Sequence, residues 1–142
     1  MPALTSTEAR ERFAVSRVAH LATVDTACRP HLVPVVFALD GDTVVLAVDH
    51  KPKRTTRLKR LANIAANPSV CLLADHYGEN WDRLWWVRAD GEARVLPSAD
   101  RCSEAAHCVG LLAAKYRQYA GRPPGGPVVE VSVLRWSGWR AS

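Results

Sequence analysis

The sequence predicts a mainly β (α+β) fold, in which a six-stranded antiparallel β-barrel carries flanking helices. Its 142 residues are enough for one domain around a single core. The content of 48% hydrophobic and 23% charged residues is typical of a globular protein. Six short runs of apolar and β-branched residues are separated by turn-forming residues, and most runs follow one another at hairpin distance. We therefore expect a single domain over residues 1–142.

The first two elements are predicted to be a helix and a buried strand. Thr5 or Ser6 can cap a helix that turns Phe13 inward and leaves charged side chains on its other face. Residues 18–24 are mostly apolar and β-branched, which favours a buried strand.

A hairpin is predicted next. Residues 31–39 form the second strand, which we expect Pro34 to interrupt locally. The Asp-Gly-Asp sequence at residues 40–42 is a strong hairpin signal, and residues 43–49 pair back as the third strand.

The middle of the chain predicts one helix and two further strands. Thr56 is a plausible N-cap, an apolar stripe follows it, and Asn67-Pro68 ends the helix. Residues 69–75 form a fourth strand. Residues 83–96 form a fifth strand or a bulged pair, with Gly91 as the expected bulge or kink.

The last third predicts a long helix and a final strand. Apolar residues recur at helical spacing over about residues 99–119. The Gly- and Pro-rich residues 121–127 then break the helix. Residues 128–136 alternate apolar and polar side chains, as a half-buried strand does.

Positive charge is concentrated in one segment. The net charge is +5, and six cations lie between residues 51 and 60, so the rest of the chain carries −1. The six are Lys51, Lys53, Arg54, Arg57, Lys59 and Arg60. A single patch on a nearly neutral protein fits a compact polyanionic ligand better than a long nucleic-acid backbone.

The position of these cations favours anion binding. Arg57, Lys59 and Arg60 fall in the predicted first turn of a helix, whose partial positive charge repels them. Free backbone N–H groups and clustered cations together form a receptor for phosphate or carboxylate. The alternative is a solvated charged face, which is the usual role of a charge run.

The five tryptophans supply a second signal. Trp85 and Trp86 are adjacent on a predicted strand, so they point to opposite faces. One of them is expected to pack at a subunit interface or beside a planar ligand. The alternative is that the helix over residues 99–119 covers that second face.

Several other classes of protein lack support in the sequence. The four cysteines and five histidines show no metal-ligand spacing, and no GxGxxG or Walker loop is present. No catalytic triad or carboxylate pair can be picked out, so we predict neither metal ligands nor catalytic side chains. No apolar run approaches membrane-spanning length, and the first residues lack the apolar segment of a signal peptide, so we expect a cytoplasmic protein.

The order of these segments resembles the split β-barrels of the pyridoxamine 5'-phosphate oxidase superfamily. Members typically open with an LATV…GRPH…P strand, turn and strand, which residues 21–34 match with Cys28 where a glycine often stands. The basic turn and helix ending in Asn-Pro, and then VCLLADHYGENW at residues 70–81, continue the likeness. Residues 84–95, LWWVRADGEARV, are similar to actinobacterial proteins classed as probable deazaflavin (coenzyme F420)-dependent enzymes.

The resemblance implies an FMN-binding type of barrel, a homodimer and a set of cofactor-binding positions. The phosphate end of the cofactor would meet Lys51, Lys53, Arg54, Arg57 and Arg60. The ring would lie against His31, Val33, Pro34 and Val35, and Asp75, His76 and Tyr77 of the other subunit would close over it. The basic turn is longer than in simpler members, so the individual phosphate ligands stay open. His31, His76 or Tyr77 could donate a proton, although each is more often a structural residue.

These observations favour an oxidoreductase that uses reduced F420 to transfer a hydride to a small organic substrate. Six cations in ten residues suit the phosphodiester and polyglutamate tail of F420 better than the single phosphate of FMN, which is the runner-up. The chain end RWSGWRAS offers no clear second phosphate site, so oxidation of vitamin B6 is disfavoured. A non-catalytic flavin- or haem-binding module is the other alternative.

Overall fold

The computed structural model describes residues 3–48 and 55–142, and for residues 55–58 it describes the backbone only. The helical elements are α1 (Ser6–Val15), α2 (Thr55–Ala66), the short 3-10 helix η1 (Trp81–Arg83), α3 (Ser103–Lys115) and α4 (Arg117–Gly121). The strands are β1 (Ala19–Val24), β2 (Pro30–Val35), β3 (Ala38–Asp40), β4 (Thr43–Ala47), β5 (Ser69–His76), β6 (Trp85–Leu96) and β7 (Val128–Arg140).

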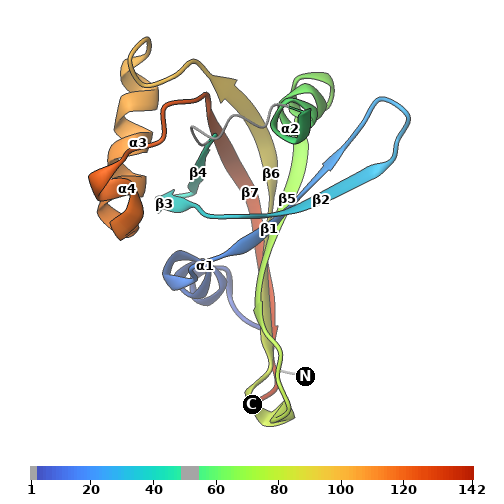
Figure 1. Ribbon diagram of the computed structural model, residues 1–142. Helices are drawn as coiled ribbons and strands as arrows, with labels where there is room; N and C mark the ends of the chain where they lie inside the picture. Colours follow the sequence, from blue (N-terminus) through green and yellow to red (C-terminus); the bar gives the residue numbers. More distant parts are fainter. Residues whose placement is uncertain (1–2, 49–54) are drawn as a thin grey trace.

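All seven strands form one antiparallel sheet in the order β2-β1-β5-β6-β7-β4-β3. The expected count of six was wrong, because residues 31–39 form two strands. The two edge strands, β2 and β3, are consecutive in the chain, so residues 36–37 lead from one edge of the sheet to the other (Figure 1). Within the described residues no strand pairing joins these edges, and the sheet is therefore curled but unclosed.

The break between β2 and β3 lies at residues 36–37 rather than at Pro34. Pro34 remains inside β2, where an edge strand tolerates a missing N–H group. The break is held by Tyr116, whose hydroxyl accepts the Phe37 N–H at 3.1 Å and lies 2.9 Å from the carbonyl oxygens of Phe37 and Arg17. A side chain 79 positions away therefore sets this bend.

Tyr116 also divides the helix that was expected over residues 99–119. The backbone of Tyr116 is extended, with φ −114° and ψ 122°, so α3 ends at Lys115 and α4 begins at Arg117. The helix also starts later than expected, with Cys102 at its N-cap.

Other expectations at the element level are confirmed. Thr5 caps α1 in a reciprocal capping box with Glu8, and Phe13 is fully buried. Gly41 has φ 61° in the two-residue turn between β3 and β4, as the hairpin signal predicted. Residue 49, the expected end of the third strand, lies outside the described residues.

The two faces of the sheet are covered differently. The inner face, which includes Leu21, Leu72 and Val87, packs against α1 and α2 in the larger apolar cluster. The outer face packs against α3 only at one end, through a smaller cluster on β3, β4 and the adjoining ends of β6 and β7 (Figure 1). Among the described residues, no helix covers the remaining outer face, over β2, β1, β5 and the other halves of β6 and β7 (Figure 1).

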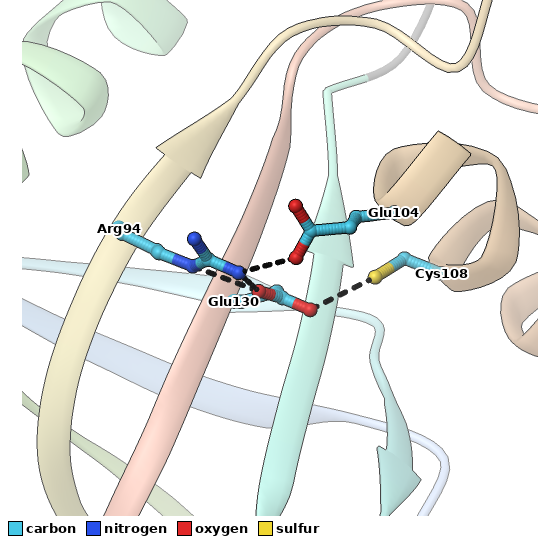
Figure 2. A network of polar contacts seen from close by, with 4 residues as sticks. All are labelled: Arg94, Glu104, Cys108 and Glu130. Atoms are coloured by element: carbon cyan, nitrogen blue, oxygen red, sulfur yellow. Dashed lines mark hydrogen bonds and ion pairs between the residues drawn. The ribbon is translucent and has the colours of Figure 1, made fainter. Parts of the chain in front are cut away.

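A polar network fixes α3 to the outer face (Figure 2). Arg94 of β6 donates to Glu130 of β7 at 2.6 Å and to Glu104 of α3 at 2.8 Å. The Cys108 thiol lies 3.5 Å from the other oxygen of Glu130. Burial, and then this carboxylate, raise the pKa of Cys108 to about 12, so the group stays a neutral thiol at physiological pH.

The irregularity predicted near Gly91 is present, but its extra residue lies in β7. The register shifts between Asp90 and Gly91, which pair with Arg135 and Val133, and Leu134 is left over. A Cβ atom on Gly91 would lie 2.2 Å from the Ser132 carbonyl oxygen. Only glycine fits here, because the backbones of β6 and β7 approach so closely.

Candidate functional site

The α2 helix carries the cations of the predicted anion site. It begins at Thr55, one residue before the expected cap, and its first turn holds no acidic residue. Arg57 lies in that first turn, whereas Lys59 and Arg60 fall in the second. Lys59 is exposed and Arg60 is half-buried. Lys51, Lys53 and Arg54 lie outside the described residues.

A buried polar contact places α2 beside the hairpin of β1 and β2. Asn63 of α2 donates a 3.1 Å hydrogen bond to the hydroxyl of Thr23, and both side chains are buried. Thr23 pairs directly with His31 across β1 and β2, so the two side chains share the inner face. One turn before Asn63, Lys59 is close enough to Asp25 to lower the pKa of that carboxyl, although the hydrogen bond from Arg29 lowers it most. The basic part of α2 therefore lies beside the end of β1, whose neighbour in the sheet is the start of β2.

β2 combines an open edge with an unsatisfied polar atom. As an edge strand, it directs alternate N–H and C=O groups away from β1. The side chains of His31, Val33 and Val35 share the inner face, and that of Pro34 points to the outer face. Val35 is packed into the core, so a ligand at this edge meets its backbone rather than its side chain. His31 Nδ1 is buried and has no hydrogen-bond partner among the described residues.

The turn that leads into β2 contains the chain's one described non-glycine residue with positive φ. Cys28 has φ 61°, a conformation that favours glycine. Cys28 is the residue that stands where the family pattern often has glycine, and this backbone conformation gives a physical reason for glycine there. The Asp25 carboxylate closes the turn by accepting the N–H groups of Ala27 and Arg29, each at 2.9 Å.

The uncovered outer face forms a shallow groove of about 330 Å³ between β5 and β6. Its lining residues are Leu73, Asp75, Tyr77, Trp86 and Arg88. Arg88 lies 3.0 Å from Asp90 and has its guanidinium 5.6 Å from the centre of the Trp86 ring. The hydroxyl of Ser137, directly across from Arg88, is buried without a hydrogen-bond partner in the described chain.

The two adjacent tryptophans do point to opposite faces. Trp85 packs against the inner core, with the guanidinium of Arg12 5.2 Å from its ring centre. Trp86 lines the outer groove. The alternative was that the helix expected over residues 99–119 covers the outer face at these tryptophans. This alternative was wrong, because the apolar cluster under α3 contains neither tryptophan. The sequence analysis did not predict Arg88 and Leu73 as groove residues. Arg88 could have been found, because side chains alternate along a strand and Arg88 therefore shares the face of Trp86. Leu73 could not, because its place in the groove depends on the pairing of β5 with β6.

The third group of predicted residues lies apart from the other two. Asp75 and His76 end β5, which starts just after α2, and Tyr77 follows them. Asn63 of α2 contacts the Thr23 end of β1, which lies opposite the start of β5 because Ala22 pairs with Cys71. Residues 75–77 begin roughly 13 Å farther along β5, so one subunit does not bring them to the basic part of α2. Figure 1 shows the end of β5, the start of β6 and the end of β7 extending away from α2. The expectation that these three residues serve the site of a second subunit stays a prediction.

Two further observations concern the described residues. They contain no group of three or more His, Cys, Asp or Glu side chains placed to hold a metal ion. None of their helices has the length and apolar character needed to cross a membrane.

This fold and site define the class of split-barrel proteins, in which an antiparallel sheet curls but stays open between two edge strands. The profile of the pyridoxamine 5'-phosphate oxidase family matches residues 5–140, and the chain belongs to this family. No curated protein matches the chain in sequence.

Solved structures share this fold over almost the whole chain. An FAD-binding protein from Mesorhizobium loti is 20% identical with a TM-score of 0.73, over 99% of this chain and 98% of that one. The FAD-binding protein from Mycobacterium smegmatis is 17% identical with a TM-score of 0.65, over 99% and 98%. The heme storage protein HutZ from Vibrio cholerae is 13% identical with a TM-score of 0.69, over 94% and 90%. At these identities the likeness establishes the fold alone.

Proposed function

We propose that this protein is a homodimeric oxidoreductase that binds a phosphorylated flavin-type cofactor, with the deazaflavin F420 favoured over FMN. One observation carries the proposal: the basic part of α2 lies beside the end of β1, and on the neighbouring edge strand β2 His31 Nδ1 is buried without a partner among the described residues. Membership of the pyridoxamine 5'-phosphate oxidase family and the FAD-binding proteins of the same fold support it.

The residues present fit such a cofactor. The cations of α2 and its free backbone N–H groups would hold the phosphate, because a helix start without acidic residues favours an anion. The open edge of β2 would offer its N–H and C=O groups to a polar ring edge, and His31 Nδ1 would gain a hydrogen-bond partner there. A bound flavin or deazaflavin supplies the hydride chemistry itself. The chain's own task is to bind, orient and exclude water.

The choice between F420 and FMN rests on the number of cations. Lys51, Lys53 and Arg54 precede α2, and together with its own cations they exceed what one phosphate can pair with. The carboxylates of a polyglutamate tail would supply further partners. Exposed ion pairs are screened by salt, so each added pair steepens the salt dependence of binding.

The test is a titration of the purified protein with F420 and with FMN at several salt concentrations. We expect tighter binding of F420, a steeper fall of its affinity with salt, and tighter binding as its glutamate tail lengthens. Equal salt slopes, or tighter FMN binding at physiological ionic strength, would leave an FMN protein instead.

A non-catalytic flavin- or haem-binding module is the second candidate. The heme storage protein HutZ has the same fold, and no set of catalytic side chains stands out in this chain. The absorbance spectrum of the purified protein separates the two candidates. A Soret band after titration with haem, together with failure to bind F420 and FMN, would favour the module.

A further inference from the structure

A cleft of about 690 Å³ lies away from α2, between the end of α1 and the far end of the hairpin of β5 and β6. We call it the α1–hairpin cleft. Its floor is a row of paired inner-face residues, because His76 pairs with Trp85 and Trp85 pairs with Arg140. Its volume falls within the range of roughly 300–1,000 Å³ that small-molecule sites occupy.

The charges in this cleft are unbalanced. Four arginines line it, Arg12, Arg17, Arg83 and Arg140, against the two carboxylates of Asp75 and Asp82. In the part of the chain that the structure describes, none of the four arginines forms an ion pair with a carboxylate.

Local structure accounts for the positions of three of these arginines and leaves Arg140. Arg12 occupies the last turn of α1, where a cation is favoured, and Arg17 donates to the Lys115 carbonyl at 3.0 Å. Arg83 likewise ends the short helix η1, whereas Arg140 has no such role. Hydrogen bonds with Thr5 are the main cause that lowers the pKa of Glu8, and the charges of Arg140 and Arg12 lower it further, but Glu8 does not line the cleft.

The rest of the lining is apolar. Val15 and Val18 are 76% and 50% exposed, although both sit beside the cleft where burial would stabilise them. Leu84 and the half-buried Trp85 complete this side. Exposed apolar side chains and unpaired guanidinium groups in one concave surface match a ligand with a flat apolar body and a charged oxygen group.

We propose that the α1–hairpin cleft is a second binding site, which takes a small, flat organic carboxylate. The carboxylate would pair with Arg12 and Arg140, since guanidinium groups bind carboxylates through two parallel hydrogen bonds. The apolar body would cover Val15 and Val18. The site shares no residue with α2 or β2, although Asp75 and His76, which are predicted to close over the cofactor of the other subunit, also line it.

The test follows the indole N–H signals of the full-length, cofactor-free protein by NMR during titration with 2-naphthoate. The Trp85 signal is assigned with the variant W85F. We expect a saturable shift of Trp85, while Trp136, whose indole donates to Asp42 at 2.9 Å on the far side of α1, stays in place. A shift of all five tryptophans alike, or no shift of Trp85, would overturn the proposal.

Matched variants and ligands separate specific pairing with the arginines from non-specific hydrophobic binding. R12Q/R140Q should bind 2-naphthoate about tenfold more weakly or worse, and the exposed single variant R83Q should weaken it less. R117Q/R122Q removes the same charge on and just after α4 and should bind normally. Equal binding of the neutral 2-naphthalenemethanol, or equal competition by inorganic phosphate, would contradict a site for flat carboxylates. Titration of R12Q/R140Q with F420 and with FMN separates this proposal from the proposed function. Normal cofactor binding beside unchanged binding of 2-naphthoate would reject the second site and leave the proposed function standing.

Discussion

Lys115 is a half-buried charged residue held by two contacts. Its ammonium group donates to the Ser16 carbonyl at 2.8 Å and lies 3.8 Å from the centre of the Phe37 ring. Both contacts favour the charged form. Burial opposes them and, with the nearby charge of Arg17, lowers the pKa of Lys115 to about 8.

The lowered pKa of Lys115 predicts a pH-dependent contribution to stability. Between about pH 8 and pH 10.5 the unfolded chain keeps a proton that the folded protein has lost. The free energy of unfolding of the wild type, relative to the variant K115M, should therefore rise with pH across this window. Urea denaturation of both proteins at several pH values measures the difference. Cys108 and Tyr116, whose pKa values are raised, titrate in both proteins. A flat difference would contradict the shift.

Cys28 gives a second prediction at this scale. A non-glycine residue at φ 61° costs roughly 1–2 kcal/mol, part of which the flexibility of glycine in the unfolded chain offsets. The variant C28G should therefore raise the free energy of unfolding by about 0.5–1 kcal/mol, as measured by urea denaturation. C28S keeps the Cβ atom and is the control. An equal gain in C28S would assign the effect to the thiol instead.

Single residues were predictable where the cause is local. The cap at Thr5 and the inward Phe13 follow from residues within two turns, and both are confirmed. The burial of Lys115 depends on Ser16, which is 99 positions away, and no local pattern reveals it. His31 could be named as a candidate, but its unsatisfied Nδ1 emerges only from the packing of β2.

The α2 helix has a cation and no acidic residue in its first turn, which disfavours the helix itself. Replacing Arg57 and Arg60 by Ala should weaken binding of the cofactor by about 2–5 kcal/mol in total, if each forms a charge-assisted hydrogen bond. The cofactor-free protein should largely keep its stability, because removing Arg57 takes a cation away from the first turn of a helix. Calorimetric titration and thermal unfolding measure the two effects. Normal binding combined with early melting would mean that the patch is structural.

The pairing of β6 and β7 depends on Gly91. In the variant G91A the new Cβ would meet the Ser132 carbonyl oxygen, so the strands must separate and the free energy of unfolding should fall by roughly 2–4 kcal/mol. Gly110 is the matched control, because it lies in α3 with no atom within 4 Å of a built Cβ. G110A should stabilise by about 0.5–1 kcal/mol. A neutral G91A would refute the close approach.

The sequence predicted helices, strands and turns better than it predicted the points where a strand or a helix is interrupted. The hairpin turn at Gly41 and the end of α2 follow from local turn and cap residues. The sequence did not predict the breaks at residues 36–37 and at Tyr116, because each depends on the other. The Tyr116 hydroxyl hydrogen-bonds to the Phe37 backbone, and this contact forms only when the chain bends at both places. Periodicity within one segment carries no sign of such a contact.

At the scale of the whole molecule, the outer face of the sheet is only half covered. α3 packs on one end, and the other end exposes Leu32 to 65% and carries the groove at Trp86. The curled antiparallel sheet with flanking helices was predictable from the order of its segments. Which half of the outer face stays open was not, since this depends on where α3 turns back.

The half-open face predicts a homodimer. Exposed large apolar side chains on an open sheet face are a mark of protein interfaces, and a symmetric dimer would cover Leu32 and Trp86 of both subunits at once. It would also bring the residues at the end of β5 to the site of the other subunit. We expect light scattering at micromolar concentration to give twice the monomer mass of 15.6 kDa.

The variant L32E tests which surface forms this dimer. A carboxylate on the outer face would be buried without a partner, so L32E should shift the protein toward the monomer and weaken cofactor binding with it. V95E places the same charge on an exposed valine of the opposite, inner face and should remain dimeric. A monomeric wild type would remove the homodimer from the proposal. A dimeric L32E beside a monomeric V95E would move the interface to the inner side of the sheet, where the α1–hairpin cleft also lies.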